Sequence, residues 1–355
     1  MKAIIQPLLI LFIVIEINTA YSQTNEVKKE VNYEKSSLFN STEPINLELL
    51  VDKKALLKDV KEDPQYHSVL IKYSSIAEGQ KEFNCKISTR GNFRRNPENC
   101  NMPPLKIKIP KNISQTENLF SGQSKLKLVL PCQQKGEKYQ ECLILEYLAY
   151  KTYELLTDIS FRTRLVNIQL KDSANLDQSI NFIGFFIEEA DQLAKRNNGK
   201  ILKFKRYHPN NVNRQQMTTL AVFEYLIGNT DWSVDVSHNI ELVFIENNTV
   251  PLAVPFDLDW SGIVDAPYAV PAEVLSITSV RQRIYRGFER SMEEYLPVIK
   301  LFNDKKQEIY NLYTNCEWLS EKTKINKIKY LDEFYEVIND PKQVEIEFIK
   351  NCRKL

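Results

Sequence analysis

The sequence predicts an α+β fold with two lobes, the first rich in strands and the second rich in helices. From Ile45 to about Lys205, several short segments alternate apolar and polar residues with period two, which is typical of half-exposed strands. After Arg206, apolar residues recur mostly at helical spacing. Runs of strands followed by runs of helices are typical of the α+β class. A length of 355 residues fits two domains, or one domain with two lobes.

The individual elements follow in order along the chain. We expect strands at Leu105–Ile109, Lys125–Leu130, Leu165–Leu170, Asn181–Ile187 and Ile201–Lys205, and a later hairpin of Ile240–Ile245 and Val250–Pro255. We expect helices at about Glu141 to Leu156, at Arg214–Ile227 with Gly228 as C-cap, and two or three within 291–355, with Ser320 as a candidate N-cap. The strand-rich lobe therefore covers 45–205 and the helical lobe 206–355.

The composition excludes several classes of protein. There are 47 basic and 46 acidic side chains, so the formal charge of +1 offers no general polycation for nucleic acid. Only nine glycines occur, and the closest two, Gly79 and Gly91, are twelve positions apart. G-x-G-x-x-G, Walker-type and G-x-S-x-G motifs are therefore absent from the sequence. Common dinucleotide-binding folds, P-loop NTPases and α/β-hydrolases with the usual nucleophile elbow are excluded together.

The N-terminal residues 1–22 are typical of a signal peptide. Lys2 gives a positive start, Ile4–Ile15 is mostly apolar, and a small-x-small cleavage site ends at Ser22. The apolar run is short for a membrane span, which needs about 20 residues; a retained anchor is the alternative. We expect a periplasmic, surface or secreted protein with no membrane span after cleavage. Residues 23–44 are polar and predict a flexible lead-in.

Six cysteines are an even number in a chain expected to be exported, so disulfides are permitted. The pairs Cys85/Cys100 and Cys132/Cys142 bracket short loops and are the first to consider. Free, buried cysteines are an equal alternative. No C-x-x-C occurs and the three histidines are far apart, which excludes a zinc finger and an H-E-x-x-H metalloprotease.

Two loops rich in acids flank the later hairpin. Because a hairpin brings its flanking segments together, we expect Asp231 and Asn239 of the first loop to converge with Asp257 and Asp259 of the second. Carboxylate and amide oxygens form a hard site of the kind that Mg²⁺ or Mn²⁺ accepts. The order helix, loop, hairpin and acid is also how protein-kinase-like folds arrange phosphoryl transfer, in which an anionic group needs cations and an aligned nucleophile.

The donor phosphates also need a cation from the strand-rich lobe, because no glycine-rich loop is available. Lys203 lies on the polar face of its expected strand, and Glu188 or Glu189 could orient it. The alternative is an ordinary half-exposed strand, because Lys125 and Lys127 show the same alternation.

Arginines provide further candidate anion sites. The basic loop 89–95 is suited to holding phosphate, with Arg90 as the candidate side chain, or it is a surface turn. Arg281, Arg283 and Arg286 either contact an acidic acceptor or form a solvated helix face.

Several of these motifs resemble the spore-coat CotH kinases. Ile-Gly-Asn-x-Asp at 227–231 resembles the catalytic-loop motif of secretory-pathway kinases and of the HipA/phosphatidylinositol-kinase branch. Pro-Phe-Asp-Leu-Asp at 255–259 resembles the Pro-Trp-Asp-x-Asp segment of the CotH family, and residues 89–92 and 184–188 are similar to CotH sequences as well. Over residues 40–290 the chain is similar to exported CotH-like proteins of Bacteroidetes type.

The resemblance implies a bilobal protein-kinase-like (CotH-type) fold with a strand-rich N-lobe and a helix-rich C-lobe. It implies transfer of phosphate from ATP to a hydroxyl on a protein, sugar or lipid, with Mg²⁺ or Mn²⁺ as cofactor. The matching positions are Asp231 for the catalytic Asp, and Asn239, Asp257 and Asp259 for the metal ligands.

Two departures from the family pattern leave alternatives open. Trp232 and Ser233 stand where the family commonly has Arg-His, and the interval from Asp231 to Asn239 is eight residues instead of five, so Asp235 is an alternative base. A catalytically inactive CotH-like pseudokinase, acting as an envelope or surface binding module, is the second functional hypothesis. A metal-dependent hydrolase that uses the same acids is the third.

Overall fold

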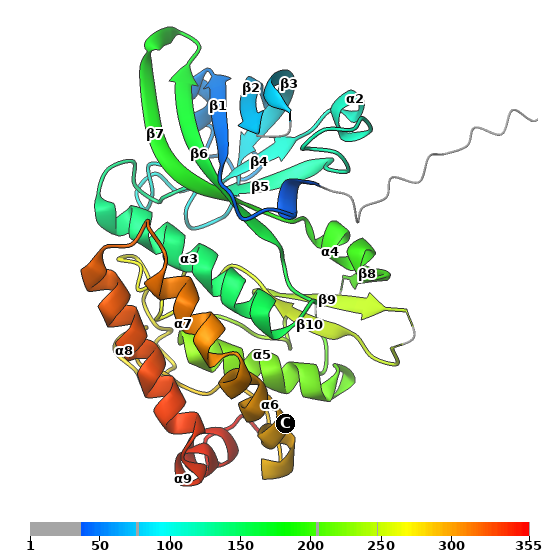
Figure 1. Ribbon diagram of the computed structural model, residues 1–355, viewed down its shortest axis with the longest axis vertical. Helices are drawn as coiled ribbons and strands as arrows, with labels where there is room; N and C mark the ends of the chain where they lie inside the picture. Colours follow the sequence, from blue (N-terminus) through cyan, green and yellow to red (C-terminus); the bar gives the residue numbers. More distant parts are fainter. Residues whose placement is uncertain (1–36, 76–77, 204–205, 247, 355) are drawn as a thin grey trace, which may run out of the picture. The chain divides into compact units, whose positions relative to one another are not determined.

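Seven strands form a closed barrel in the computed structural model, which describes residues 37–75, 78–203, 206–246 and 248–354 (Figure 1). Around the ring the strands follow the order β1-β2-β3-β4-β5-β7-β6. Neighbours are antiparallel, except that β1 and β6 are parallel. The barrel strands are β1 (Ile45–Val51), β2 (His67–Ser75), β3 (Gly79–Thr89), β4 (Leu105–Lys108), β5 (Lys125–Val129), β6 (Thr163–Asp172) and β7 (Asn175–Ile187).

Alternate residues of these strands fill the interior of the barrel with apolar side chains. In β1, for example, every second residue from Ile45 to Val51 is buried. Strand β7 pairs with both β5 and β6, and the three strands approach one another closely at Gly184. A Cβ atom on Gly184 of β7 would lie 2.7 Å from both the Val129 oxygen and Ile168 Cδ1, so a side chain there would push the three strands apart.

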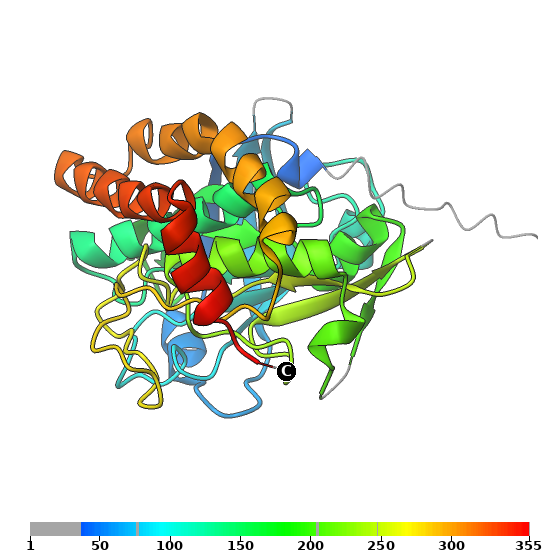
Figure 2. The same ribbon diagram turned by 90° about the horizontal axis from the view of Figure 1, so that it is seen from below.

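A second sheet and most of the helices share a separate apolar core. Leu56 of the first helix and Ile113 of the second pack instead with the core of the barrel. Helix α3 (Glu137–Leu156) contacts β6 and β7 as well as α5 (Arg214–Ile227) and α7 (Lys306–Thr314). Helix α5 also contacts β10 (Leu252–Pro255), α6 (Met292–Asp304) and α8 (Glu321–Ile338) (Figure 2). The second sheet has the order β10-β9-β8, with β8 (Gly199–Leu202), β9 (Ile240–Ile245) and β10 (Leu252–Pro255). The α-helices are α1 (Lys53–Lys58), α2 (Lys111–Ser114), α3 (Glu137–Leu156), α4 (Ala190–Arg196), α5 (Arg214–Ile227), α6 (Met292–Asp304), α7 (Lys306–Thr314), α8 (Glu321–Ile338) and α9 (Pro341–Val344). Short 3₁₀ helices lie at η2 (Ser37–Phe39) and η3 (Pro209–Asn211), and a π-helix lies at η4 (Glu345–Lys350). Within the described ranges, no helix combines the length and hydropathy needed to cross a bilayer.

The predicted bilobal protein-kinase-like (CotH-type) fold is wrong. The strands form a closed seven-stranded mixed barrel, because β1 returns in parallel beside β6 and β7 joins β5. Period-two alternation indicates that a segment is a strand, but it does not indicate which strands pair. The β1–β6 ladder joins Ile45 to Val166, and no local pattern specifies so distant a pairing.

The individual helices and strands agree better with the predictions made from the sequence. The helix at Arg214–Ile227 and its Gly228 C-cap are confirmed, as are the strand Ile240–Ile245 and the Ser320 N-cap. The strand expected at Ile201–Lys205 is shorter and lies earlier, at Gly199–Leu202. The predicted signal peptide and the lead-in up to residue 36 lie outside the described residues.

The disulfide joins Cys100 to Cys132, and neither of the two pairs expected from short loops forms. The other four cysteines are free and buried. The ladder β3-β4-β5 explains the pairing, because it brings the segment after β3 beside the segment after β5. A main-chain hydrogen bond from Met102 to Cys132 lies next to the bridge. The disulfide therefore anchors the segment that follows the basic loop 89–95.

Candidate functional site

The first acidic loop begins where α5 ends. Gly228 adopts the left-handed conformation with φ +66°, and its N–H caps the helix. A Cβ atom here would lie 2.0 Å from the Tyr330 hydroxyl, so only glycine fits. The side-chain oxygen of Asn229 then accepts a hydrogen bond from the Asp231 N–H at 2.9 Å. These contacts fix the direction in which the loop leaves the helix.

The loop folds back so that Asp231 contacts Asn239. Ser233 and His238 exchange two main-chain hydrogen bonds of 2.9 Å. The Asn239 amide donates to the Asp231 main-chain oxygen at 2.8 Å and to its Oδ2 at 3.1 Å. His238 Nε2 lies 2.9 Å from Asp231 Oδ1. Both carboxylate oxygens of Asp231 are therefore oriented, and each keeps a lone pair for another donor.

The second acidic loop lies directly beside the first. The Phe256 N–H donates to the Asn239 carbonyl at 3.1 Å, which extends the β9–β10 ladder by one bond. Gly262 donates to the Gly228 carbonyl at 3.1 Å and closes the other end. Asp257, with φ +59°, donates its N–H to the Tyr150 hydroxyl at 2.8 Å. Its carboxylate is exposed and has no partner among the described residues.

Asp259 has a different environment from Asp257. Its side chain is buried, accepts a hydrogen bond from the Tyr268 hydroxyl at 2.8 Å, and lies 3.9 Å from Arg94. Burial and the nearby Asp257 raise the pKa of Asp259 to about 6, although Arg94 opposes the shift. Arg94 also lies 3.7 Å from the buried Glu146 of α3, whose pKa is raised by burial and by Asp259. Asp259 thus belongs to a buried charge network.

Lys127 of β5 provides a cation that faces these loops. Its neighbours Leu126 and Leu128 point into the barrel, so Lys127 points outward, with its ammonium 5.8 Å from the Phe161 ring and 5.9 Å from the Phe256 ring. No hydrogen bond or ion pair joins it to any other described residue. Burial lowers the pKa of Lys127, and the negative charges of Glu189, Glu241 and Asp257 oppose that shift.

The basic loop contacts the same region. Phe93 packs on Trp260 and Tyr268, with ring centroids 5.3 and 5.4 Å apart. Arg90 is half-buried, and its Nε atom is buried without a partner. Its charge acts on the pKa of both Lys127 and Glu146. The loop therefore brings a second incompletely paired cation toward the acids.

The pair predicted from Lys203 and Glu188 does not form. Lys203 is exposed beyond the end of β8. Glu188 is buried and pairs with Arg196 at 3.0 Å, so it has a structural role. The alternative base, Asp235, pairs with Arg353 and accepts a hydrogen bond from the Ser233 hydroxyl at 3.4 Å.

The three later arginines have separate roles. Arg283 donates to the main-chain oxygens of Tyr225 and Leu226 at the end of α5, and thus acts as a helix cap. Arg281 lies near Asp265. Arg286 is half-buried, and burial lowers its pKa while Asp231 and Asp235 oppose the shift. Of the three, Arg286 is the one that lies in range of Asp231.

Sequence reasoning gave no site role to Lys127, Glu146 or the tyrosines around them, and it placed Arg94 only within the basic loop suited to holding phosphate. Lys127 alternates with leucines in the same way as Lys125, so nothing local distinguishes the two lysines. Glu146 occupies a buried helical position where an apolar residue is normal, and a lone acid on an apolar helix face was the available signal.

The acids give a partial fit to a divalent cation. Asp257 offers a free carboxylate, and Asn239 keeps its amide oxygen, because only its nitrogen donates. Asp259 is already engaged by Tyr268 and Arg94 and fits a ligand role poorly. No group of three or more His, Cys, Asp and Glu side chains is placed to hold a metal in the described part of the chain. Mg²⁺ is commonly held by one or two carboxylates, with water and substrate phosphates completing its shell.

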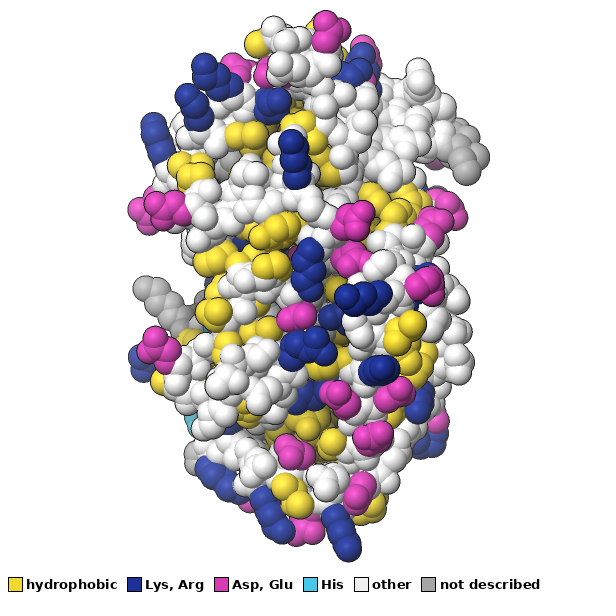
Figure 3. Space-filling view, turned by 90° about the vertical axis from the view of Figure 1, so that its left-hand side faces the viewer, with side chains coloured by type: hydrophobic (Ala, Val, Ile, Leu, Met, Phe, Trp, Pro, Cys, Tyr) yellow, Lys and Arg dark blue, Asp and Glu magenta, His cyan; other side chains and the backbone are white. Residues whose placement is uncertain are grey.

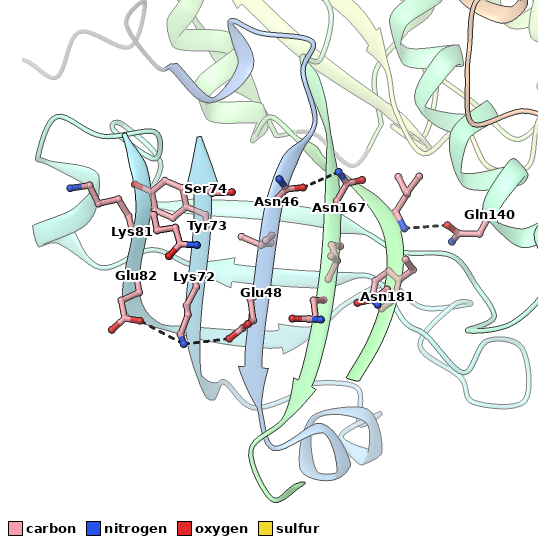
Figure 4. Close-up of a pocket in the computed structure, with 16 residues that line it drawn as sticks. Asn46, Glu48, Lys72, Tyr73, Ser74, Lys81, Glu82, Gln140, Asn167 and Asn181 are labelled. Atoms are coloured by element: carbon pink, nitrogen blue, oxygen red, sulfur yellow. Dashed lines mark hydrogen bonds and ion pairs between the residues drawn. The ribbon is translucent and has the colours of Figure 1, made fainter. Parts of the chain in front are cut away.

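A large hollow in the described structure lies elsewhere. It has a volume of about 960 Å³, and polar side chains on the outer face of β1, β2, β3, β6 and β7 line it (Figure 4). Several of these side chains pair with one another: Asn167 donates to Asn46 at 3.0 Å, and Lys72 lies between Glu48 and Glu82 at 3.5 and 3.9 Å. No candidate residue named above lines this hollow.

Comparisons with known proteins add no family assignment. The chain matches no protein-family model, and a search of curated proteins finds no similar sequence.

Proposed function

We propose that the protein is an exported, metal- and ATP-dependent phosphotransferase that acts on a hydroxyl acceptor. The main supporting observation is the convergence of Asp231, Asn239 and Asp257 at one end of the β9–β10 hairpin, with the unpaired ammonium of Lys127 in electrostatic range. Phosphoryl transfer needs cations on the transferred group and an oriented acceptor, and these residue types supply both. The resemblance of the two loops to CotH kinase motifs supports the same activity.

Asp231 is the proposed proton acceptor. A hydroxyl group that donates to its free lone pair would be aligned by a carboxylate that His238 and Asn239 already orient. Arg286 lies in range of this carboxylate and could contact an acidic group on the acceptor. The acceptor itself, on a protein or another molecule, is not specified by these contacts.

Asp257 and the amide oxygen of Asn239 would hold Mg²⁺ or Mn²⁺. When bound, the cation would neutralise part of the charge on the donor phosphates. Asp259 would not itself be a ligand. It would instead stabilise the loop that carries Asp257, through its buried interaction with Arg94.

Lys127 and Arg90 are the proposed ligands of the donor phosphates. Both carry charges without a complete set of partners, and both lie on the barrel side of the acidic loops. A phosphate oxygen would satisfy donors that are otherwise unpaired at partly buried positions. Lys127 thus replaces Lys203 in the role that the sequence indicated for a strand lysine.

Export is supported by the signal-peptide pattern and by the Cys100–Cys132 disulfide. Disulfides persist mainly in oxidising compartments such as the periplasm and the cell exterior.

The activity is tested with purified protein, labelled ATP and either Mg²⁺ or Mn²⁺. The Lys127→Met variant should lose about 99% of phosphate transfer or more, and the Asp257→Asn variant at least as much, because removing one electrostatic contact to a transition state costs roughly 10²-fold or more. Lys125→Met is the matched control, since it lies on the same face of β5 but is exposed. Transfer that survives both substitutions in folded protein would refute the assignment.

An inactive binding module is the second candidate. It is favoured by the single free carboxylate at the site, since Asp259 is engaged by Arg94 and Tyr268. Thermal-shift titration with ATP and Mn²⁺ separates the candidates: stabilisation of the wild type but not of Lys127→Met supports the phosphotransferase, and no stabilisation of either supports the binding module.

A further inference from the structure

Two cations lie beside one carboxylate at the first turn of α3, and a third cation, from α8, lies within electrostatic range of all three. Lys138 of α3 and Arg281 of the loop before α6 each lie 3.7 Å from Asp265 Oδ2. The charges of Asp265, Lys138 and Arg281 all act on the pKa of Lys327 in α8. Distances of 3.7 Å are longer than hydrogen bonds, so Asp265 does not use up the donors of either cation. These four residues are called the Asp265 cluster below.

Hydrogen bonds hold the three elements in register. Glu141 of α3 accepts bonds from the Ser320 N–H and the Thr323 hydroxyl, both at 2.8 Å, at the start of α8. One residue further along α3, Cys142 Sγ lies 3.8 Å from the Val264 carbonyl of the loop. Residues four apart share a helix face, so Lys138 faces the loop with Cys142, and Lys327 follows Thr323 along α8. The cluster is therefore a preformed arrangement.

Lys327 combines a buried stem with an ammonium that has no partner among the described residues. Its side chain is almost completely buried, with 6% exposed, and no hydrogen bond or ion pair joins it to the described residues. Burial lowers the pKa of Lys327 to about 8, and Asp265 only partly opposes this effect. The ammonium at the end of this stem keeps some contact with solvent, and an anion bound there would offset the cost of its partial desolvation. Glu141 does not fill this role, because Ser320 and Thr323 already occupy its carboxylate.

We propose that Lys138, Arg281 and Lys327 form a binding site for a phosphate-sized oxyanion, either free phosphate or the phosphoryl group of a phosphorylated ligand. A tetrahedral dianion accepts several charge-assisted hydrogen bonds at once, which one carboxylate at 3.7 Å does not do. The site opens to solvent, since the side chains of Lys138 and Arg281 are 49% and 51% exposed. It shares no residue with the donor-phosphate ligands Lys127 and Arg90, and it does not depend on the proposed phosphotransfer.

Thermal unfolding in phosphate, compared with chloride at matched ionic strength, tests the site. Phosphate should raise the Tm of the wild type by several degrees, because a ligand at ten times its Kd multiplies the folded population about elevenfold. Lys327→Met should remove the rise. Lys329→Met is the matched control, because Lys329 is exposed on the same helix, and it should keep the rise, as should Lys127→Met.

Additional ligands identify the source of the anion, and a second variant keeps the test valid if Lys327→Met does not fold. Free phosphoserine in place of phosphate distinguishes a phosphorylated ligand from the free ion, and sulfate tests whether any tetrahedral anion suffices. Arg281→Gln lies at an exposed position and should reduce the rise even if Lys327→Met does not fold. An equal rise in the wild type and in both variants, or no rise in the wild type, would overturn the proposal. Loss of the rise in Lys127→Met alone would place phosphate at the other site and would overturn it too.

Discussion

The side-chain amide of Asn239 donates to both the main-chain oxygen and the carboxylate of Asp231, at 2.8 and 3.1 Å. The two residues are eight positions apart, and the chain between them closes through the Ser233–His238 bridge. Asn239 has φ +53°, a conformation that asparagine tolerates better than most residues. One side chain thus shapes the loop and orients the carboxylate that we propose as the proton acceptor.

Substitution of Asn239 separates these two contributions. Asn239→Gly removes the amide but suits the positive φ, whereas Asn239→Ala removes the amide and adds backbone strain of about 1 kcal/mol. We expect both variants to lose at least about tenfold in phosphate transfer, and only Asn239→Ala to lose that additional stability in urea unfolding. Full transfer by folded Asn239→Gly would show that the amide does not orient Asp231.

Local sequence patterns predicted the elements around this site well. The apolar spacing of 214–227 followed by Gly228 defines α5, and the hairpin placed Asn239 and Asp257 in neighbouring loops. Each of these features depends on residues close together in the sequence. The patterns are physical consequences of helix and strand periods, so they can be read without knowledge of the tertiary structure.

The remaining features depend on distant contacts that no local pattern specifies. Closure of the barrel depends on the β1–β6 ladder, and Lys127 differs from Lys125 only in what packs against it. The sequence suggested that Glu188 or Glu189 orients Lys203, and the structure pairs Glu188 with Arg196. The fold class was mispredicted for this reason, and the same dependence on distant contacts leaves Lys127 indistinguishable from the other strand lysines in the sequence.

The buried carboxyl of Asp259 should make stability depend on pH. Its pKa is raised to about 6, so the folded protein binds the proton more tightly than the unfolded chain does. The stability of the wild type relative to Asp259→Asn should therefore be greatest below about pH 4 and fall by roughly 2–3 kcal/mol as pH rises through 6. Urea unfolding from pH 4 to 7.5 measures this difference. Asp63→Asn is the control at an exposed acid, and its curve should parallel that of the wild type.

The Cys100–Cys132 bridge should contribute substantially to stability. It closes a segment with a sequence separation of 32, for which loop-closure entropy predicts about 3–4 kcal/mol. Cys100→Ser/Cys132→Ser should lower the free energy of unfolding by roughly this amount, and reductant should destabilise the wild type but not the double variant. An equal response of both proteins to reductant would show that the bridge is not formed.

Gly228 should be the residue of the first acidic loop that is least tolerant of substitution. Two separate effects act against a side chain: the left-handed φ of +66°, and the Tyr330 hydroxyl 2.0 Å from the position of a Cβ atom. Gly228→Ala should therefore cost about 1 kcal/mol for the backbone, with a further and larger cost for the clash.

Tyr330→Phe removes the hydroxyl, which has no hydrogen-bond partner among the described atoms, so it should by itself be nearly neutral. In the double variant the cost of Gly228→Ala should shrink toward the backbone value, and a double-mutant cycle from urea unfolding measures the coupling. Additive effects of the two substitutions would show that the loop after α5 moves away from Tyr330 without cost.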